Sequence, residues 1–485
     1  MSEEVKKAGR DPNVVAKAAL WYTVCTFMFR GMAFVTTPIF ARLMSKAELG
    51  SFSNFSSWAG IILVLTAFDF SQSVIRAKLE FEDDIDGYIW STLSLSTMWT
   101  LLVYGIFCLF PAFFSELLQI DTKYIHLMFL YLFTAPAYTM LVTKHRAFYK
   151  YKTFVLITGI MTVSGTLLSL LMVILMQDKL AGRLYGYYIP HILIGAAIFI
   201  LLAARGKKIK TSYWKYACVI CLPLVPHELS LYVLSASDKI IITRLSGVEY
   251  TAVYSIAYST YHIGMVLFDS MNKAFAPWLL ESLHHERYGA IRKTSKVYVG
   301  VFVAVVIGVL TLAPEIIWLM GGKRYAGAVN CIPPLIVSCV VQLIYRMYVN
   351  VEFYKKKTVG VALATMIAAA TNIILNYFLI PLDLEHSYVI ASYTTLAGYL
   401  ILFVMHYYMV RRMKLDHVFD IKFLLKIIAG VMLVAAAMNS LYGVNAFVRY
   451  VFALIYGGAV LYFGYKNKDA VLGLFKKKKR NSGKP

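Results

Sequence analysis

Fourteen long apolar segments, separated by short polar or charged loops, constrain the fold of this chain more than any other feature. A helix that crosses a bilayer needs about 20 mostly apolar residues, and each segment meets that requirement. Hydrophobic residues make up 59% of the chain and charged residues 15%, against roughly half and a quarter in soluble domains. We therefore predict an all-α polytopic membrane protein with about 14 transmembrane helices. The approximate spans are 15–41, 50–75, 87–110, 124–143, 154–176, 184–204, 217–243, 250–276, 297–320, 328–350, 359–380, 388–410, 423–442 and 447–465.

The distribution of Lys and Arg between the loops predicts the orientation of the chain. If the N-terminus lies in the cytoplasm, that side carries 35 of the 48 Lys and Arg residues, and the outside loops carry nine. Positively charged loops stay in the cytoplasm, so we expect both termini there and a location in the cytoplasmic (inner) cell membrane. The basic cytoplasmic tail, 466–485, is expected to meet anionic membrane lipids and not nucleic acid.

A weak internal repeat indicates how the spans are grouped. Residues 42–65 align without a gap on residues 244–267, with seven identities, at an offset of 202. Both copies join the first to the second span of a six-span set in the same orientation, a layout that secondary transporters use. We therefore expect two six-helix lobes in parallel pseudo-repeat, 1–210 and 211–414, followed by two additional transmembrane helices in 415–465.

Charged residues at membrane depth are the candidate functional residues, because each costs about 2.5 to 3.5 kcal/mol at the bilayer centre and normally faces a watery interior. Those that lie deep in the apolar segments include Arg30, Asp69, Asp238, Lys239, Asp269, Lys273 and Arg346. Helical periodicity would place Asp69, Gln72 and Arg76 on one face of the second span. For Asp269 and Lys273, an ion pair within one helix is an equally good interpretation.

The cations among these residues suit an anionic substrate. Arginine presents a planar fork that matches two phosphate oxygens at once. We predict that Arg30, Lys239, Lys273 and Arg346 bind substrate in an aqueous cavity between the lobes. The hypothesis depends most on Arg30, because it lies in the middle of its span with no acid within a turn on its own helix.

The acids predict coupling to an ion gradient. Burial favours the protonated form of a carboxylate, so Asp69, Glu228, Asp238 and Asp269 are candidates for carrying a proton or Na⁺. The segment LPLVPHELS at 222–230 contains two prolines, and we expect the seventh span to break or kink there. Broken helices mark the binding sites of many transporters, although a simple packing kink is an equally good interpretation.

Sequence motifs of the common membrane enzymes and pumps are missing. The chain has no Walker A loop, no H-E-x-x-H and no G-x-S-x-G. Its ten histidines lack metal-ligand spacing, and its six cysteines lie in apolar runs, where they act as small buried hydrophobes. We therefore expect a protein that is not an enzyme and that needs neither a metal nor a cofactor.

Three segments match motifs of one known family. Residues 30–53, RGMAFVTTPIFARLMSKAELGSFS, are similar to its first span and the exit from it. Residues 237–259, SDKIIITRLSGVEYTAVYSIAYS, and 371–381, TNIILNYFLIP, are similar to its seventh and eleventh spans. In the second copy of the internal repeat Ala252 stands where the first has Gly50. The chain thus resembles the polysaccharide-biosynthesis flippases, the O-antigen or capsule repeat-unit branch of the multidrug/oligosaccharidyl-lipid/polysaccharide exporter superfamily.

The resemblance implies a substrate class and a mechanism. It implies a flippase that moves polyprenyl-diphosphate-linked oligosaccharide across the membrane by alternating access coupled to an ion gradient, with a polysaccharide polymerase as a partner. Asn376, in the third segment, joins the candidate substrate-binding residues. The alternatives are a peptidoglycan lipid-precursor flippase and a multidrug exporter of the same superfamily, whose cavity we would expect to hold acids and aromatics. A membrane glycosyltransferase, polymerase or ligase needs a large external loop that this chain lacks.

Overall fold

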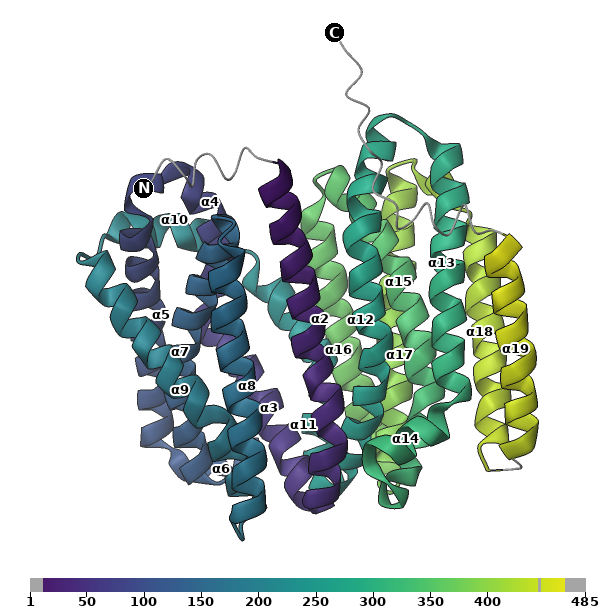
Figure 1. The fold of residues 1–485 in the computed structure, drawn as a ribbon, viewed down its shortest axis with the longest axis horizontal. Coiled ribbons are helices and arrows are strands. Elements are labelled where there is room, and N and C mark those ends of the chain that lie inside the picture. Colours follow the sequence, from purple (N-terminus) through teal and green to yellow (C-terminus); the bar gives the residue numbers. More distant parts are fainter. Residues whose placement is uncertain (1–11, 444–445, 467–485) are drawn as a thin grey trace. The chain divides into compact units, whose positions relative to one another are not determined.

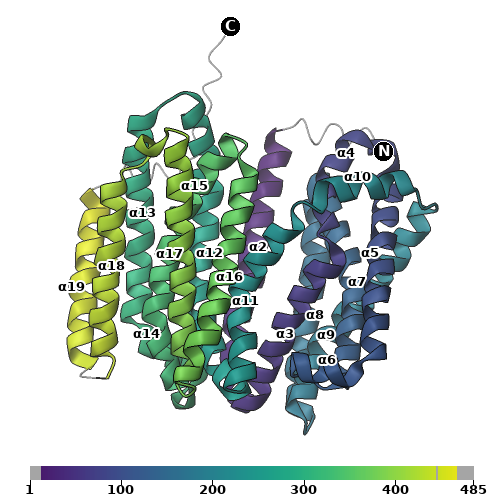
Figure 2. The same ribbon diagram turned by 180° about the vertical axis from the view of Figure 1, so that it is seen from behind.

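The computed structural model describes residues 12–443 and 446–466, and all regular elements in these ranges are helices (Figure 1, Figure 2). The long helices are α2 (Pro12–Leu43), α3 (Lys46–Ala67), α5 (Ile85–Leu109), α7 (Thr122–Ala147), α8 (Tyr151–Leu175), α9 (Lys179–Gly206), α10 (Thr211–Cys221), α11 (Val225–Leu245), α12 (Val248–His284), α13 (Tyr288–Thr311), α15 (Ile332–Tyr354), α16 (Thr358–Leu379), α17 (Ser387–Arg412), α18 (Ile421–Leu441) and α19 (Ala446–Lys466). The shorter elements are η1 (Phe70–Gln72), α4 (Ser73–Glu80), η2 (Glu82–Asp84), α6 (Pro111–Leu118), α14 (Ala313–Gly321), η3 (Lys323–Cys331), η4 (Ile380–Leu382) and η5 (Asp416–Val418). The prediction of an all-α fold is confirmed.

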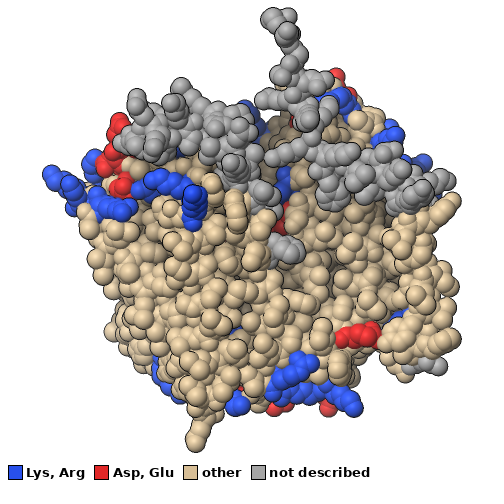
Figure 3. Space-filling model, in the orientation of Figure 1, with Lys and Arg blue, Asp and Glu red and all other residues tan. Residues whose placement is uncertain are grey.

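The membrane-spanning character of the helices is clear from their length and composition. Within the described residues, ten helical segments are long and apolar enough to cross a membrane, or eleven if α10 and α11 form one bent span. On the face drawn in Figure 3, Lys and Arg gather near the helix ends, and almost all the surface between them is uncharged. The protein is a multi-pass membrane protein. The expected count of about 14 spans is not confirmed, because α2, α12 and α19 do not meet the same criteria over their described residues.

The helices form two compact units. Unit 1 comprises Met1–Ser255 and Ile380–Ser387, and unit 2 comprises Ile256–Leu379 and Tyr388–Pro485. The boundary on the chain falls inside α12, whose first turns belong to unit 1. The expected lobe boundaries at residues 210 and 414 stay predictions, and most of the basic tail lies outside the described residues.

Two glycines let helices of unit 1 approach closely. The helix α3 packs along α11. A Cβ on Gly50 of α3 would lie 1.7 Å from the carbonyl oxygen of Val248, at the start of α12. A Cβ on Gly60 would lie 1.7 Å from the hydroxyl oxygen of Tyr232 on α11. A larger side chain at Gly50 would meet backbone, and one at Gly60 would require Tyr232 to move, so both glycines permit this close approach.

Polar and aromatic contacts attach the linker after α9 to the start of α5. Lys210 Nζ and the Tyr213 hydroxyl both donate to Asp84 Oδ2, at 2.6 and 2.7 Å. The ring of Phe81 lies 4.8 Å from that of Tyr213 and stacks on that of Tyr88 at 5.6 Å, measured between centroids. These contacts hold α10 against α5 at one end of unit 1.

The helix α15 is the central element of unit 2. It packs against α13 and α18. In the segment Lys323–Tyr354, which contains α15, 83% of the most apolar 18-residue stretch is buried. Its sequence is apolar around nearly the whole circumference, as expected of a helix that other helices surround. The helices α18 and α19 lie side by side (Figure 1, Figure 2). Arg449 and Tyr450 of α19 both donate to the Glu315 carboxylate of α14, the tyrosine at 2.8 Å.

The prediction for the second half of the second span is wrong. The helix α3 ends before Asp69, because Phe68 and Asp69 adopt the left-handed conformation with φ of 49° and 47°. Asp69 Oδ1 accepts a hydrogen bond from Ser71 Oγ at 2.8 Å, a local contact with which Asp and Ser compete against helical backbone bonds. The common helical face predicted for Asp69, Gln72 and Arg76 therefore does not form.

The expected break in the seventh span is confirmed. The helices α10 and α11 are bent by 55° at residues 222–224. A proline, Pro226, lies in the first turn of α11, where its missing N–H breaks no helical hydrogen bond. Cys221 Sγ donates to the backbone carbonyl of Asp69 at 3.6 Å. The breaks after α3 and after α10 therefore lie next to each other inside unit 1.

Helix boundaries follow the offset of the internal repeat. The helix α2 ends at Leu43 and α3 begins at Lys46, while α11 ends at Leu245 and α12 begins at Val248. Each boundary in the second copy lies 202 residues after its counterpart, the offset that aligns the two sequences. The repeat thus marks two helix–turn–helix corners of the same design.

Candidate functional site

Arg346 occupies a half-buried position in unit 2, on the otherwise buried helix α15. Its Nε donates to the Tyr345 hydroxyl at 3.4 Å, and its guanidinium carbon lies 5.4 Å from the centre of the Phe268 ring on α12. Asp269 of α12 acts on it electrostatically. No carboxylate among the described residues forms an ion pair with Arg346. The structure therefore brings Arg346 and Asp269 into one neighbourhood, as members of the predicted site.

Tyrosines of three helices surround this arginine. The Tyr345 ring lies parallel to that of Tyr399 on α17, with centroids 6.2 Å apart. Gln342, one turn earlier on α15, donates to the hydroxyl of Tyr261 on α12. Buried hydroxyl and amide groups need such partners, and together they give α12, α15 and α17 a shared polar core. A guanidinium in this setting can offer donors to an anion while aromatic faces hold it in place.

Asp238 joins α11 to the start of α12 in unit 1. Its carboxylate is buried, with 1% of the residue exposed, and accepts a hydrogen bond from the Tyr254 hydroxyl at 2.5 Å. Next to it Lys239 is half-buried, and its backbone carbonyl accepts from Thr251 Oγ1 at 3.2 Å. Asp238 and Lys239 thus lie together where two helices meet. The hydrogen bond from Tyr254 is by itself a sufficient structural reason for a buried aspartate at this position. The role of Asp238 in binding a coupling ion therefore stays a prediction.

Asp69 and Glu228 lie close to the two helix breaks of unit 1. Asp69 occupies the break after α3, with its backbone carbonyl bonded to Cys221 at the end of α10. Glu228 belongs to the first turn of α11, directly after the second break, and is half-buried. Irregular backbone at membrane depth is tolerated where it lines a cavity or is buried in protein. The structure thus places Asp69 close to the break in the seventh span, which the sequence did not predict.

Asn376 takes part in a buried network between α16 and α17 of unit 2. It is 0% exposed, and its Oδ1 accepts a hydrogen bond from Thr394 Oγ1 at 2.5 Å. Its Nδ2 and that of Asn372 form further bonds inside the same group at 3.4 Å. Lys273, by contrast, is exposed on α12. The side chain of Arg30 lies outside the described part of the structure, so its predicted role is untested.

Arg183, which lies just before the expected span 184–204, belongs to the helix α9. Its guanidinium carbon lies 3.5 Å from the Phe40 ring centre and 4.4 Å from that of Phe52, and its Nη1 donates to Ser169 Oγ at 2.9 Å. Stacking on two aromatic rings holds the charge within the bundle of unit 1. The aromatic residues that surround it come from three helices, which no local pattern reveals.

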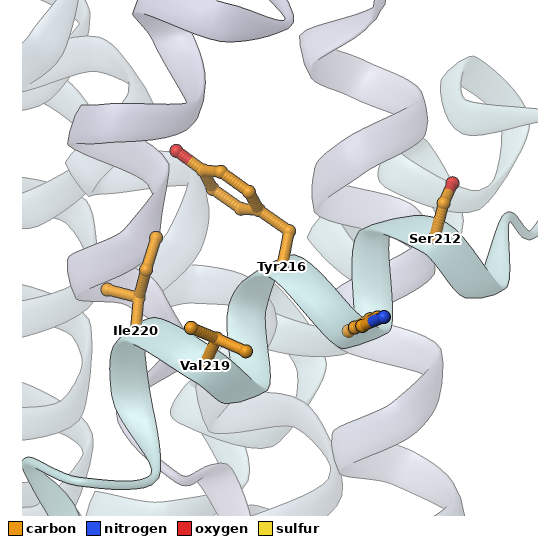
Figure 4. Close-up of a pocket in the computed structure, with 5 residues that line it drawn as sticks. Ser212, Tyr216, Val219 and Ile220 are labelled. Atoms are coloured by element: carbon orange, nitrogen blue, oxygen red, sulfur yellow. The ribbon is translucent and has the colours of Figure 1, made fainter.

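Surface pockets are found away from the predicted residues. One lies on α10 and is lined by Ser212, Lys215, Tyr216, Val219 and Ile220 (Figure 4). Another lies on α14 and is lined by Pro314, Glu315, Trp318 and Leu319. Both are open depressions, and the surface that lines them is almost entirely apolar.

The described residues contain no group of three or more His, Cys, Asp or Glu side chains placed to hold a metal ion. All six cysteines are free thiols. Cys108 on α5 is exposed, Cys218 is half-buried, and the others are buried.

Comparison with known proteins gives consistent matches. The family model described as Polysaccharide biosynthesis protein matches residues 15–283, more than half of the chain. A structure of the lipid II flippase MurJ in an inward closed conformation has a TM-score of 0.68 at 15% identity, covering 93% of this chain and 100% of that one. No curated protein sequence gives a significant match.

Transporters of the MOP superfamily share the fold as well. An inward-facing multidrug resistance MATE family transporter has a TM-score of 0.59 at 13% identity, covering 80% of this chain and 95% of that one. A MOP superfamily transporter from Pyrococcus furiosus has a TM-score of 0.56 at 14% identity, covering 85% of this chain and 99% of that one. The fold is therefore one of flippases and transporters, and the chain belongs to the polysaccharide biosynthesis protein family.

Proposed function

We propose that this protein is a flippase that moves polyprenyl-diphosphate-linked oligosaccharide repeat units across the cytoplasmic membrane for O-antigen or capsule synthesis. Both termini lie in the cytoplasm, and a polysaccharide polymerase uses the product. The main support is Arg346, a half-buried guanidinium for which the described residues supply no ion-paired carboxylate. A half-buried guanidinium without an ion-paired carboxylate is costly, and a diphosphate offers oxygens that fit its donors two at a time.

Transport proceeds by alternating access between two lobes. The diphosphate is held by Arg346 together with Arg30, Lys239 and Lys273, and Asn376 contacts the substrate in another state of the cycle. An ion gradient drives the cycle through acids inside the bundle, for which the candidates are Asp69, Glu228, Asp238 and Asp269. The cations oppose the multidrug-exporter alternative, because a site for organic cations needs acids in their place.

The likeness to the lipid II flippase favours a second candidate substrate, a peptidoglycan lipid precursor of similar chemistry. The two candidates share the diphosphate and differ in the attached sugars. Transport measured with each of the two lipids therefore distinguishes the candidate functions, whereas a single variant of the protein does not.

The test uses purified protein in vesicles that contain a lipid-linked oligosaccharide, a peptidoglycan lipid precursor or an organic cation. We expect the wild type to move the oligosaccharide lipid, and Arg346→Gln to move it at least about tenfold more slowly, since a hydrogen bond to a charged group is worth roughly 1.5–3 kcal/mol. Arg346→Lys should retain part of the rate. The matched control is Arg324→Gln, because Arg324 also lies over an aromatic ring, at 5.1 Å from the centre of Tyr325, but is exposed.

Two outcomes would refute the proposal. Movement of the oligosaccharide lipid by Arg346→Gln at the wild-type rate would remove Arg346 from the site. Transport of the peptidoglycan precursor or the organic cation, with no movement of the oligosaccharide lipid, would establish an alternative.

A further inference from the structure

Unit 2 contains a carboxylate–imidazole pair that the proposed function leaves unused. Glu352 of α15 is 0% exposed and His406 of α17 is 1% exposed. His406 Nδ1 lies 3.0 Å from Glu352 Oε2 and 3.1 Å from Oε1. Ionisable side chains inside a membrane-embedded bundle are expensive, and they commonly belong to the paths of protons, ions or substrates.

The pair is chemically suited to hold one exchangeable proton. With one proton bound, the two groups together are neutral, as imidazolium with carboxylate or as imidazole with carboxylic acid. Without it they carry one negative charge, which is strongly disfavoured away from water unless another charge compensates it. Histidine is also the side chain whose ordinary protonation change lies closest to neutral pH. The pair therefore offers a place for one exchangeable proton inside unit 2.

Tyr345 connects this pair to the candidate substrate site. Its ring lies parallel to the His406 imidazole, with centroids 5.6 Å apart, and its hydroxyl accepts from Arg346 Nε. A change of charge at His406 acts on Arg346 across one aromatic ring in a region of low dielectric constant. Because such coupling is reciprocal, an anion bound at Arg346 must in turn change the proton affinity of the pair.

A loop of three lysines follows the end of α15 that carries Glu352. Glu352 lies in the last turn of α15, and Lys355, Lys356 and Lys357 follow that helix directly. The backbone N–H of Lys357 donates to the Glu352 carbonyl at 2.9 Å. This basic loop marks the side on which we expect the proton to leave. Other titratable groups that contact or act on residues of α15 include Tyr261, Tyr298, Tyr399, Tyr407, Asp269 and Asp416.

We propose that the coupling ion is a proton and that the Glu352–His406 pair carries it. One proton binds to the pair from the outer side and is released to the cytoplasm beside the lysine loop, in exchange for one lipid-linked substrate moved outward. Only the bond to the exchanged proton forms and breaks. The inference rests on the proposed function for its substrate, and it assigns coupling to residues outside the sequence-derived set.

The experiment measures transport of a short polyprenyl-diphosphate oligosaccharide into vesicles, with the membrane potential clamped to zero. Each preparation is measured without a pH gradient and with a gradient of one pH unit. One proton per cycle limits the stimulation to about tenfold, because one pH unit corresponds to a tenfold change in proton activity. We expect Glu352→Gln and His406→Gln to transport more slowly than the wild type without a gradient, because the exchanged proton has lost its carrier, and to show no stimulation with one.

A matched control exists in the exposed pair Asp383–His386. Their side chains are 50% and 55% exposed, and His386 Nδ1 lies 2.9 Å from Asp383 Oδ2. Because water surrounds that pair, Asp383→Asn should keep the full stimulation. Thermal unfolding of each variant shows whether it is folded, and a purely structural role of the buried pair would lower stability while leaving the stimulation intact.

The two ideas fail in different ways. Full stimulation in either variant of the buried pair would overturn the proton assignment while leaving the flippase proposal standing, as would loss of stimulation in Asp69→Asn alone. If the wild-type protein moves no oligosaccharide lipid under any gradient, the flippase proposal is refuted, and the proton assignment is refuted with it.

Discussion

Replacing Gly50 by alanine tests the contact between the start of α3 and the start of α12. The new methyl carbon would lie 1.7 Å from the carbonyl oxygen of Val248, 2.6 Å from its carbonyl carbon and 3.2 Å from its Cα. Carbon–oxygen contacts of this kind are normally about 3.3 Å or longer, so one backbone has to move by about 1.5 Å. A backbone cannot rotate away as a side chain can, and the neighbouring helices have to shift with it.

The size of the effect follows from two opposing terms. Overpacking of a tight contact costs typically about 1–3 kcal/mol, and alanine recovers up to about 1 kcal/mol over glycine inside a helix. For a backbone obstacle we expect the upper part of that range, and a net loss of about 2 kcal/mol. Such a loss lowers the ratio of folded to unfolded protein by roughly 30-fold.

Two other glycines supply graded controls. At Gly60 the obstacle is the end of the Tyr232 side chain, which can turn aside, so Gly60→Ala should cost less. Around Gly105 in α5 nothing lies within 4 Å of the added carbon, so Gly105→Ala should be neutral or slightly stabilising.

Thermal unfolding of the three purified variants in one detergent is the measurement. The expected order of Tm is Gly50→Ala lowest, Gly60→Ala intermediate and Gly105→Ala highest. A Tm of Gly50→Ala equal to that of Gly105→Ala would refute the close approach of the two helix starts.

Three further predictions concern unit 2. Thr394→Val removes the donor to Asn376 Oδ1, and thermal unfolding should show a loss of about 1–3 kcal/mol, the usual cost of an unsatisfied buried group; unchanged stability would contradict the network. A hydrogen bond from Lys296 lowers the pKa of Asp420, so its stabilising effect is present above the ordinary carboxylate pKa and fades as pH falls through the lowered one. Asp420→Asn should therefore lower Tm more at neutral pH than near pH 3, and an equal loss at both would speak against the ion pair. Glu315→Gln should weaken the contact of α14 with α19 and make α19 more accessible in limited proteolysis, whereas wild-type cleavage rates would show that the contact is dispensable.

The spans could be predicted because a bilayer leaves the backbone few choices. Polar backbone groups inside lipid have to bond within their own helix, so apolar length alone located the segments. Pro223 and Pro226 predicted the break of the seventh span for the same reason, since proline removes a helical donor. The end of α3 escaped notice because Phe68 and Asp69 interrupt the helix without proline or glycine, through a local bond between side chains.

The site residues were harder to predict because their partners lie far apart in sequence. Asp238 lies on α11 and Tyr254 on α12, so neither helix by itself reveals the hydrogen bond between them, and the coupling role of Asp238 stays a prediction. Glu352 lies 54 residues from His406, and neither stands out within its own segment. Hydropathy locates a charged residue along the membrane, but only packing determines which side chain it meets.

The free thiols of the chain simplify spectroscopy on it. With the buried sulfurs protected by packing, substitution of Cys108 and the half-buried Cys218 leaves a background in which maleimide reagents find little to modify. Spin labels or fluorophores attached to newly introduced cysteines, one in each unit, would then report distance changes during transport while Cys221, Cys331 and Cys339 keep their native contacts.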